Sequence, residues 1–477
     1  MASIFDTASA KPLKRESLSV GSHVDGIDDD DIPVIRQLIK VWRDRWEKNV
    51  IRSGYYFARY HLRDFGISIP PSIRAQVRAC VGWPAKAVRS LADIEVFDGF
   101  ESPTDTLNVG ALSDELGLDL IVPEAIVSAY THGCSFITLT ADDDGRLVAT
   151  PRSAEYSAAL WDGTRNRLRA VLTINDANSR GYIRGWNVFL PGRVYQVKWD
   201  QSRWAAVASQ TNWPEPLAIP FISDPQLSRP LGRSRITPTL MSLTDMAFRT
   251  YVRMEASAEF YSVPKLWFLG ASKDAFDSDT WSNLVSAING IDADEETGEK
   301  PEMKQVSQAS MTPHVDMLKS IAMSVAAETN LPVDSLGITL TNPTSAEAMA
   351  AAERRLTREA DRQNRIFGSQ LERLIRTAVC LRDGISCDAM PDELKNVSAI
   401  WQPTREISDG ARGDFYVKVS QVNPAYATST VGLRRLGLTS DEIRSLQSAT
   451  SSANSRGILD LLLNQSSNAE PATTGTE

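Results

Sequence analysis

A stripe of mostly apolar side chains within residues 346–381 constrains the fold of this chain more than any other feature. Its members recur at steps of three and four residues, which places them on one face of an α-helix. They are Met349, Ala352, Leu356, Ala360, Gln363, Phe367, Leu371, Leu374, Ala378 and Leu381. The stripe persists for about ten turns at 3.6 residues per turn. The sequence therefore predicts one long helix over residues 346–382.

The segment before this helix predicts a loop that the helix braces. Residues 331–337 are rich in turn formers, and residues 338–341 read as extended chain. Pro343 disfavours a helical start at Asn342, whereas Thr344 and Glu347 have the spacing of a capping box. We therefore expect a loop at residues 331–345 that leads directly into the helix.

The opposite side of the predicted helix carries a row of arginines. The chain has a formal net charge of −9, yet the helical period is kept by Arg354, Arg358, Arg362, Arg365 and Arg376, with Arg355 and Arg373 beside them. Like charges four residues apart destabilise an isolated helix by a few tenths of a kcal/mol, about 0.2–0.5 per pair. The row would be better tolerated against acids of a neighbouring subunit or against a phosphate backbone. A plain solvated face is as consistent with the sequence as either of these.

Composition excludes some classes of function. Hydrophobic residues make up 42% and charged residues 23%, which is typical of a soluble globular protein. The negative net charge argues against a general nucleic-acid binder, but not against a protein that surrounds DNA without strong contacts to its phosphates. We expect no signal peptide, no membrane-spanning helix, and four scattered cysteines that stay reduced in a cytoplasm.

The pattern along the chain predicts an α+β fold with several parts. A flexible N-terminal arm is expected at residues 1–29, and the region of residues 133–222 is expected to be mostly β, with an Asp-Gly hairpin turn near Gly145. The other predicted elements are helices at 32–50, 84–91, 116–131, 237–261, 312–330, 409–422 and 440–447, strands at 94–97, 265–269 and 397–401, and a disordered tail at 449–477. The helices at 237–261 and 312–330 bracket a module of residues 262–311.

Signatures of catalysis or metal binding are not found in the sequence. Phosphate-binding, dinucleotide-binding, nucleophile-elbow and His-Glu-x-x-His motifs are all missing. His132 and Cys134 have no matching second pair of zinc ligands. The acidic segment from Asp292 departs from a calcium loop, since Gly298 falls at position seven and Met303 at position twelve. We expect no enzyme, no metal and no cofactor; an unrecognised soluble enzyme remains the alternative from another class.

With these landmarks, residues 30–447 resemble the portal proteins of tailed bacteriophages, in the group related to the portal of a Bacillus siphophage and common in actinobacterial phages and prophages. The resemblance rests on the order and spacing of several short pieces. They are Gly82-Trp83-Pro84, Gly99-Phe100, Leu231-Gly232-Arg233-Ser234-Arg235-Ile236, Glu255 to Phe260 with Pro264, Leu331-Pro332 to Leu336-Gly337, Asn342-Pro343-Thr344-Ser345-Ala346-Glu347, and Asp414 with Lys418 before Leu436-Gly437.

The resemblance implies a portal fold whose parts can be assigned. A mixed wing would span residues 30–236 with a strand region at 383–407, and stem helices would lie at 237–261 and 312–330. A small α/β clip would span 262–311, a tunnel loop 331–345, the long wing or tunnel helix 346–382, and a helical crown 408–448. Another virion assembly protein, such as a capsid or adaptor subunit, is the structural alternative.

The same resemblance implies function and partners. The chain would form a closed ring of about twelve copies at one capsid vertex of the virion, assembled in the host cytoplasm. Double-stranded DNA would pass through the ring, which would meet the terminase large subunit, a head-tail adaptor, and the major capsid and scaffolding proteins. The implied DNA-facing residues are Thr339, Leu340, Thr341 and Asn342. We further expect Leu356, Phe367 and Leu371 to form an intersubunit seam, so that Phe367→Asp would abolish ring assembly.

Overall fold

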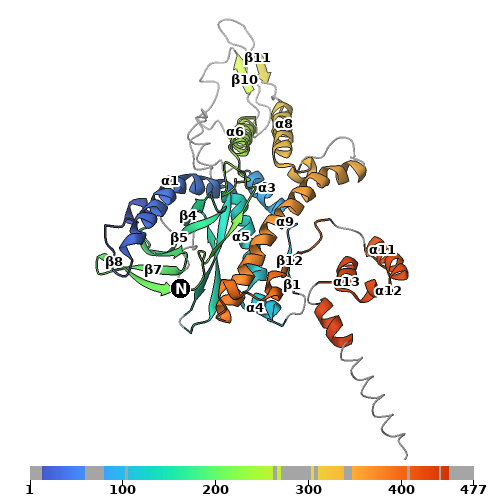
Figure 1. Ribbon diagram of the computed structural model, residues 1–477. Helices are drawn as coiled ribbons and strands as arrows, with labels where there is room; N and C mark the ends of the chain where they lie inside the picture. Colours follow the sequence, from blue (N-terminus) through green and yellow to red (C-terminus); the bar gives the residue numbers. More distant parts are fainter. Residues whose placement is uncertain are drawn as a thin grey trace, which may run out of the picture. The chain divides into compact units, whose positions relative to one another are not determined.

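The computed structural model describes ten stretches of the chain, namely residues 13–59, 80–102, 106–142, 144–261, 266–269, 302–305, 310–337, 346–405, 409–439 and 442–450. The chain divides into two compact units. One consists of residues 1–50, 88–235 and 354–477, and the other of residues 51–87 and 236–353. Helices and antiparallel sheets occur together, so the fold is α+β, as the sequence predicts (Figure 1).

A five-stranded antiparallel meander, in the order β4-β5-β6-β7-β8, forms the larger sheet of the first unit. Its strands are β4 (Ser157–Asp162), β5 (Arg167–Ala177), β6 (Ile183–Leu190), β7 (Arg193–Asp200) and β8 (Arg203–Gln210). Alternate side chains such as Trp186 and Val188 point to one face, because successive side chains in a strand alternate between faces. That face packs against α1 (Ile32–Tyr56) through Ile35, Leu38 and Trp42, and Figure 1 shows α1 beside the sheet.

The N-terminal segment differs from the flexible arm that composition predicts. Residues 13–29 lie on this sheet, with η1 at Arg15–Ser17 and η2 (Asp29–Asp31) just before α1. Leu18 is fully buried, Asp25 forms a parallel bridge to Ala205, and the indole of Trp204 donates to the Ser19 carbonyl at 2.9 Å. The flexible-arm prediction is wrong for these residues, because a few apolar side chains among many polar ones suffice to bury the segment.

A three-stranded sheet, β3-β2-β9, packs against a helix of the same unit, α5 (Leu118–His132). Its strands are β2 (Cys134–Ala141), β3 (Leu147–Ser153) and β9 (Ala218–Ile222), and β2 pairs antiparallel with both neighbours. The hairpin predicted around Gly145 is confirmed. The region of residues 133–222, predicted to be mostly β, contains the strands β2 to β9. The helix predicted at residues 116–131 is α5 (Leu118–His132), and a further helix, α4 (Val109–Glu115), precedes it; Gly117, in a left-handed conformation, separates the two.

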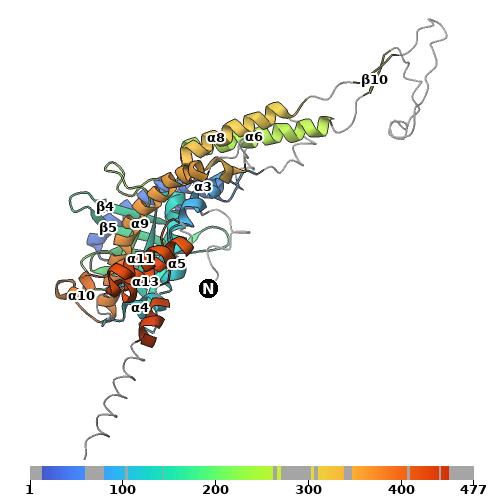
Figure 2. The same ribbon diagram turned by 90° about the vertical axis from the view of Figure 1, so that its right-hand side faces the viewer.

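The second unit contains two helices that lie side by side, α6 (Pro238–Tyr261) and α8 (Thr312–Thr329) (Figure 2). Between them in sequence, β10 (Leu266–Leu269) pairs antiparallel with β11 (Glu302–Gln305). The bounds of both helices agree with the sequence prediction. After α8, Asn330 ends the helix in a left-handed conformation, and the 3-10 turn η5 spans Val333–Leu336.

The long helix α9 runs over Ala346–Arg382, as the sequence predicts. The turns η6 (Cys387–Ala389) and α10 (Asp392–Lys395) follow it, and then β12 (Ser398–Trp401), which pairs antiparallel with β1 (Phe97–Glu101). The remaining helices are α3 (Trp83–Ala92), α11 (Asp409–Val422), α12 (Pro424–Thr428) and α13 (Thr430–Leu436), the last three packed on one another. Within the described ranges, no helix combines the length and apolarity that crossing a bilayer requires.

Candidate functional site

The apolar stripe of α9 is part of the core of its own chain. Phe367 is fully buried, with its ring 5.9 Å from the Tyr130 ring of α5 and 5.4 Å from the Phe221 ring of β9. Leu371 is also fully buried, and Leu356 is 9% exposed. These side chains join α9 to the three-stranded sheet and its covering helix.

The intersubunit seam predicted at Leu356, Phe367 and Leu371 stays a prediction, which the burial of these side chains within the single chain disfavours. A side chain that is buried within one chain has no surface left for a neighbouring copy. A helical stripe indicates that one face of the helix is covered, but it does not say whether the cover comes from the same chain or from another.

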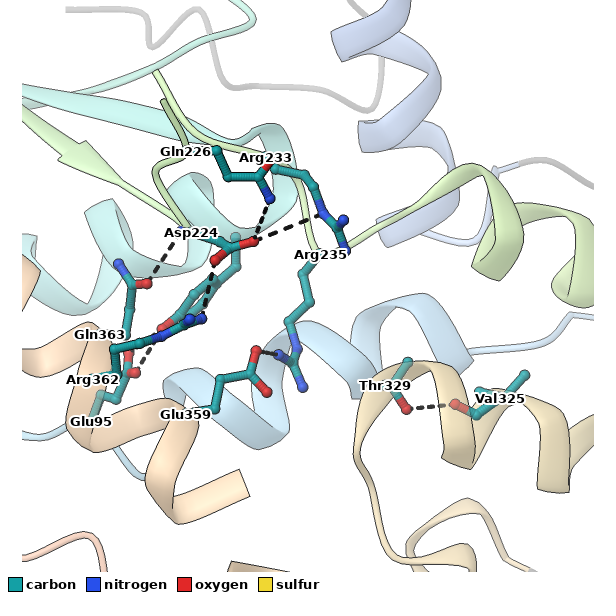
Figure 3. Close-up of polar contacts among 11 residues, drawn as sticks. Glu95, Asp224, Gln226, Arg233, Arg235, Val325, Thr329, Glu359, Arg362 and Gln363 are labelled. Carbon is teal, nitrogen blue, oxygen red and sulfur yellow. Dashed lines mark hydrogen bonds and ion pairs between the residues drawn. The ribbon is translucent and has the colours of Figure 1, made fainter. Parts of the chain in front are cut away.

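Gln363, the polar member of the stripe, anchors α9 to the end of β9. Its Nε2 donates to the Ile222 carbonyl at 2.6 Å, and its Oε1 accepts from the Asp224 amide at 3.2 Å (Figure 3). Only 2% of Gln363 is exposed, so both bonds are shielded from water. A polar residue at an apolar position was the one sequence signal of this anchor, since buried amides require partners.

Asp224, directly after β9, gathers positively charged side chains around one carboxylate. Arg362 Nη2 lies 3.0 Å from Asp224 Oδ1 and Arg233 Nε lies 4.0 Å from Oδ2, while Gln226 Nε2 donates to Oδ2 at 3.2 Å (Figure 3). Sequence patterns gave no sign of this cluster, because Arg362 lies 138 residues from Asp224 in the chain. It shows that Arg362 already has an acidic partner within its own subunit.

A second polar cluster is buried between α5 and α9. The hydroxyl of Tyr130 donates to both carboxylate oxygens of Glu95, at 2.6 and 2.7 Å. Arg235, whose backbone amide donates to the Tyr130 carbonyl at 2.8 Å, pairs through its guanidinium with Glu359 on α9 (Figure 3). Burial raises the pKa of Glu95 well above its ordinary value, and burial with the Glu95 charge raises the pKa of Tyr130. Glu95 therefore loses its proton at a higher pH in the folded chain than in the unfolded chain.

The predicted arginine row divides into two parts with different surroundings. Arg373 pairs with Glu215, and Arg376 donates to the carbonyls of Leu394 at 3.0 Å and Val397 at 3.1 Å. Nearer the start of α9, Arg354, Arg358 and Arg365 are exposed, and within the described part of the chain no ion pair involves them. The arginines in the C-terminal half of the row therefore stabilise the fold, and those in the N-terminal half are exposed to solvent.

Residues 338–345 of the predicted tunnel loop lie outside the described residues. This applies to Thr339, Leu340, Thr341 and Asn342, and also to the capping residue Thr344. The described chain reaches Gly337, which is left-handed at φ 80° after η5, and resumes at Ala346, where α9 begins. In the ranges that can be described, no three His, Cys, Asp or Glu side chains are grouped so as to hold a metal ion.

Comparison with known proteins gives a consistent result. Residues 78–444 match the family model described as phage portal protein, SPP1 Gp6-like. The portal protein of Mycobacterium phage L5 is 28% identical over 416 residues, covering 82% of each chain. That of Mycobacterium phage D29 is 28% identical over 406 residues, covering 80% of this chain and 81% of its own. A chain from the virion of a native gene transfer agent particle has a TM-score of 0.41 at 12% identity, covering 75% of this chain and 89% of that one, which is too low for an argument about fold.

Proposed function

This chain belongs to the SPP1 Gp6-like family of phage portal proteins, and from that premise we propose that it forms a ring at one vertex of the capsid. Double-stranded DNA is packaged and later ejected through this ring. The terminase large subunit and then a head-tail adaptor dock on it, and the major capsid and scaffolding proteins surround it. Because the family consists of structural virion proteins, the chain is a virion component and not an enzyme, as the sequence predicts.

The observation that carries this proposal is the order of elements in the second unit. Helices α6 and α8 lie side by side and bracket residues 262–311, within which β10 pairs with β11. Two helices with a small module at one end match a stem and a clip. We assign the stem to residues 237–261 and 312–330, and the clip, which meets the terminase and the adaptor, to residues 262–311.

The rest of the chain is assigned to the remaining portal parts by the same reasoning. The two sheets and their helices at residues 30–236, with the strand region at 383–407, form the wing. The packed helices α11, α12 and α13 lie within the crown at residues 408–448. Their position after α9 in the chain supports this assignment.

The DNA-facing part is proposed to be the tunnel loop at residues 331–345, with Thr339, Leu340, Thr341 and Asn342 nearest the DNA. These residues lack charge, as does the rest of the extended stretch at 338–341. A channel wall without cations suits sliding, since each phosphate contact adds salt-dependent affinity. The net charge of −9 is consistent with such a wall.

The test replaces Thr339, Leu340 and Thr341 by glycine in the phage or prophage that encodes the chain. Rings of the purified variant should keep the wild-type mass, because the loop is proposed to face the DNA and not a neighbouring subunit, whereas the DNA content per particle should fall. Mass photometry measures the rings, and quantitative PCR on nuclease-treated particles measures the DNA.

A matched control replaces Thr164, Arg165 and Asn166, in the exposed turn between β4 and β5, by glycine. This variant should package normally. Unchanged DNA per particle in the tunnel-loop variant would contradict the assignment of the loop. A purified wild-type chain that never forms a closed ring would count against the proposed function as a whole.

A further inference from the structure

The N-terminal half of α9 presents an exposed row of arginines that lacks a full set of partners among the described residues. Arg354 and Arg358 are one turn apart, and Arg365 lies on the same side two turns further on. Arg362, between them, pairs with Asp224, yet its side chain remains 60% exposed. We call these four residues the arginine face. Because like charges at this spacing repel one another, the row favours an external anion.

Helices α4 and α5 present a surface of opposite charge. Residues 109–131 contain Asp114, Glu115, Asp119 and Glu124 but no lysine or arginine. All four carboxylates are exposed, and no ion pair involves them in the part of the chain that the structure describes. We call these four residues the acidic face. The dipole of α5 favours Asp119, which lies in its first turn, but it gives no reason for Glu124 in the second turn.

The acidic face also exposes apolar surface. Leu120 is 70% exposed and Pro123 is exposed beside it, both on the side of α5 that carries Asp119 and Glu124. An exposed leucine and proline flanked by the carboxylates of Asp119 and Glu124 suit a protein contact, in which apolar surface is buried inside a charged rim.

We infer that the arginine face of one copy docks onto the acidic face of the next copy in the ring. The two faces belong to different elements of one chain, so the contact is heterologous, as a closed ring requires. Arginine suits this role because its planar guanidinium binds a carboxylate through two parallel hydrogen bonds. Binding of the arginine face to DNA would leave the acidic face unexplained, whereas a second copy accounts for both. This inference rests on the proposed function, because it needs a ring.

The test is a charge-reversal experiment on the full-length chain. One variant carries Arg354→Glu and Arg358→Glu, a second carries Asp119→Arg and Glu124→Arg, and a third combines all four changes. At low salt the fraction of subunits in rings, measured by mass photometry, should fall at least about tenfold in each double variant. In the combined variant this fraction should return to the wild-type value. Mixing the two double variants should also restore rings, because alternating copies then meet through opposite charges.

Controls separate this contact from general effects. Arg165→Glu with Arg180→Glu changes the net charge as much as Arg354→Glu with Arg358→Glu does, but at exposed positions outside the arginine face, and should leave the rings intact. Thermal melting of dissociated subunits should stay close to the wild type for every variant, because the changed side chains are exposed; the variants that carry Asp119→Arg should lose only the small helix-dipole contribution.

Other outcomes overturn the inference in distinct ways. Normal rings with reduced DNA per particle in the Arg354→Glu, Arg358→Glu variant would mean that the arginine face meets DNA. Loss of rings in both double variants without recovery in the combination or the mixture would mean that the two faces meet different partners. In both cases the ring itself, and so the proposed function, would stand.

Discussion

Replacing Phe367 by alanine should destabilise the wing of the single subunit. The ring of Phe367 is fully buried between Tyr130 and Phe221, so the substitution leaves a cavity at the junction of α9, α5 and β9. Phe-to-Ala changes in cores cost about 3–5 kcal/mol, to which each lost aromatic pair contributes about 0.5–1.5. A domain is stable by only about 5–15 kcal/mol, so the loss is a large fraction of the total.

The assay is urea unfolding of purified subunits followed by tryptophan fluorescence, with ring formation measured in parallel. Ser369→Ala, at an exposed position two residues further along α9, is the matched control and should stay within about 0.5 kcal/mol of the wild type. The Phe367→Ala midpoint should fall even in protein that has been dissociated to subunits. If instead the unfolding midpoint is unchanged and only ring formation is lost, Phe367 contacts a neighbouring copy and the burial argument fails.

Three further substitutions test other parts of the site. The stability of the wild type should fall as pH rises above 4.5, the ordinary Glu pKa, because between this pH and the raised pKa of Glu95 the unfolded chain binds fewer protons than the folded chain. Glu95→Gln removes the titrating group and should make this fall less steep. Equal pH slopes of the urea midpoint in the two proteins would refute this. Gln363→Leu should cost about 1–3 kcal/mol for each buried backbone group left unpaired, and a wild-type urea midpoint would show that water replaces the side chain. Gly232→Ala should lower the melting temperature more than Gly145→Ala. Both glycines have positive φ, but only at Gly232 would the new Cβ lie 2.2 Å from a backbone oxygen. Equal falls in melting temperature would mean that backbone strain alone, and not this close contact, destabilises the variant.

Sequence alone predicted those elements whose signal is local and periodic. The bounds of α9, α6 and α8 followed from apolar spacing and from the prolines and turn formers at their ends. The hairpin at Gly145 followed from its Asp-Gly turn. By contrast, β9 pairs with β2, a strand about eighty residues earlier in the chain, and no local pattern predicts such a pairing.

Only the tertiary structure showed which residues contact each side of α9. The stripe established that one face is buried, but only the fold showed that Phe367 packs against Tyr130 and Phe221 of the same chain. Likewise the sequence established a row of arginines, but only the fold showed that Arg373 is paired within the chain while Arg354 and Arg358 are exposed. The physical reason is that periodicity reports the geometry of one helix, whereas burial and ion pairing depend on residues brought together from far along the chain.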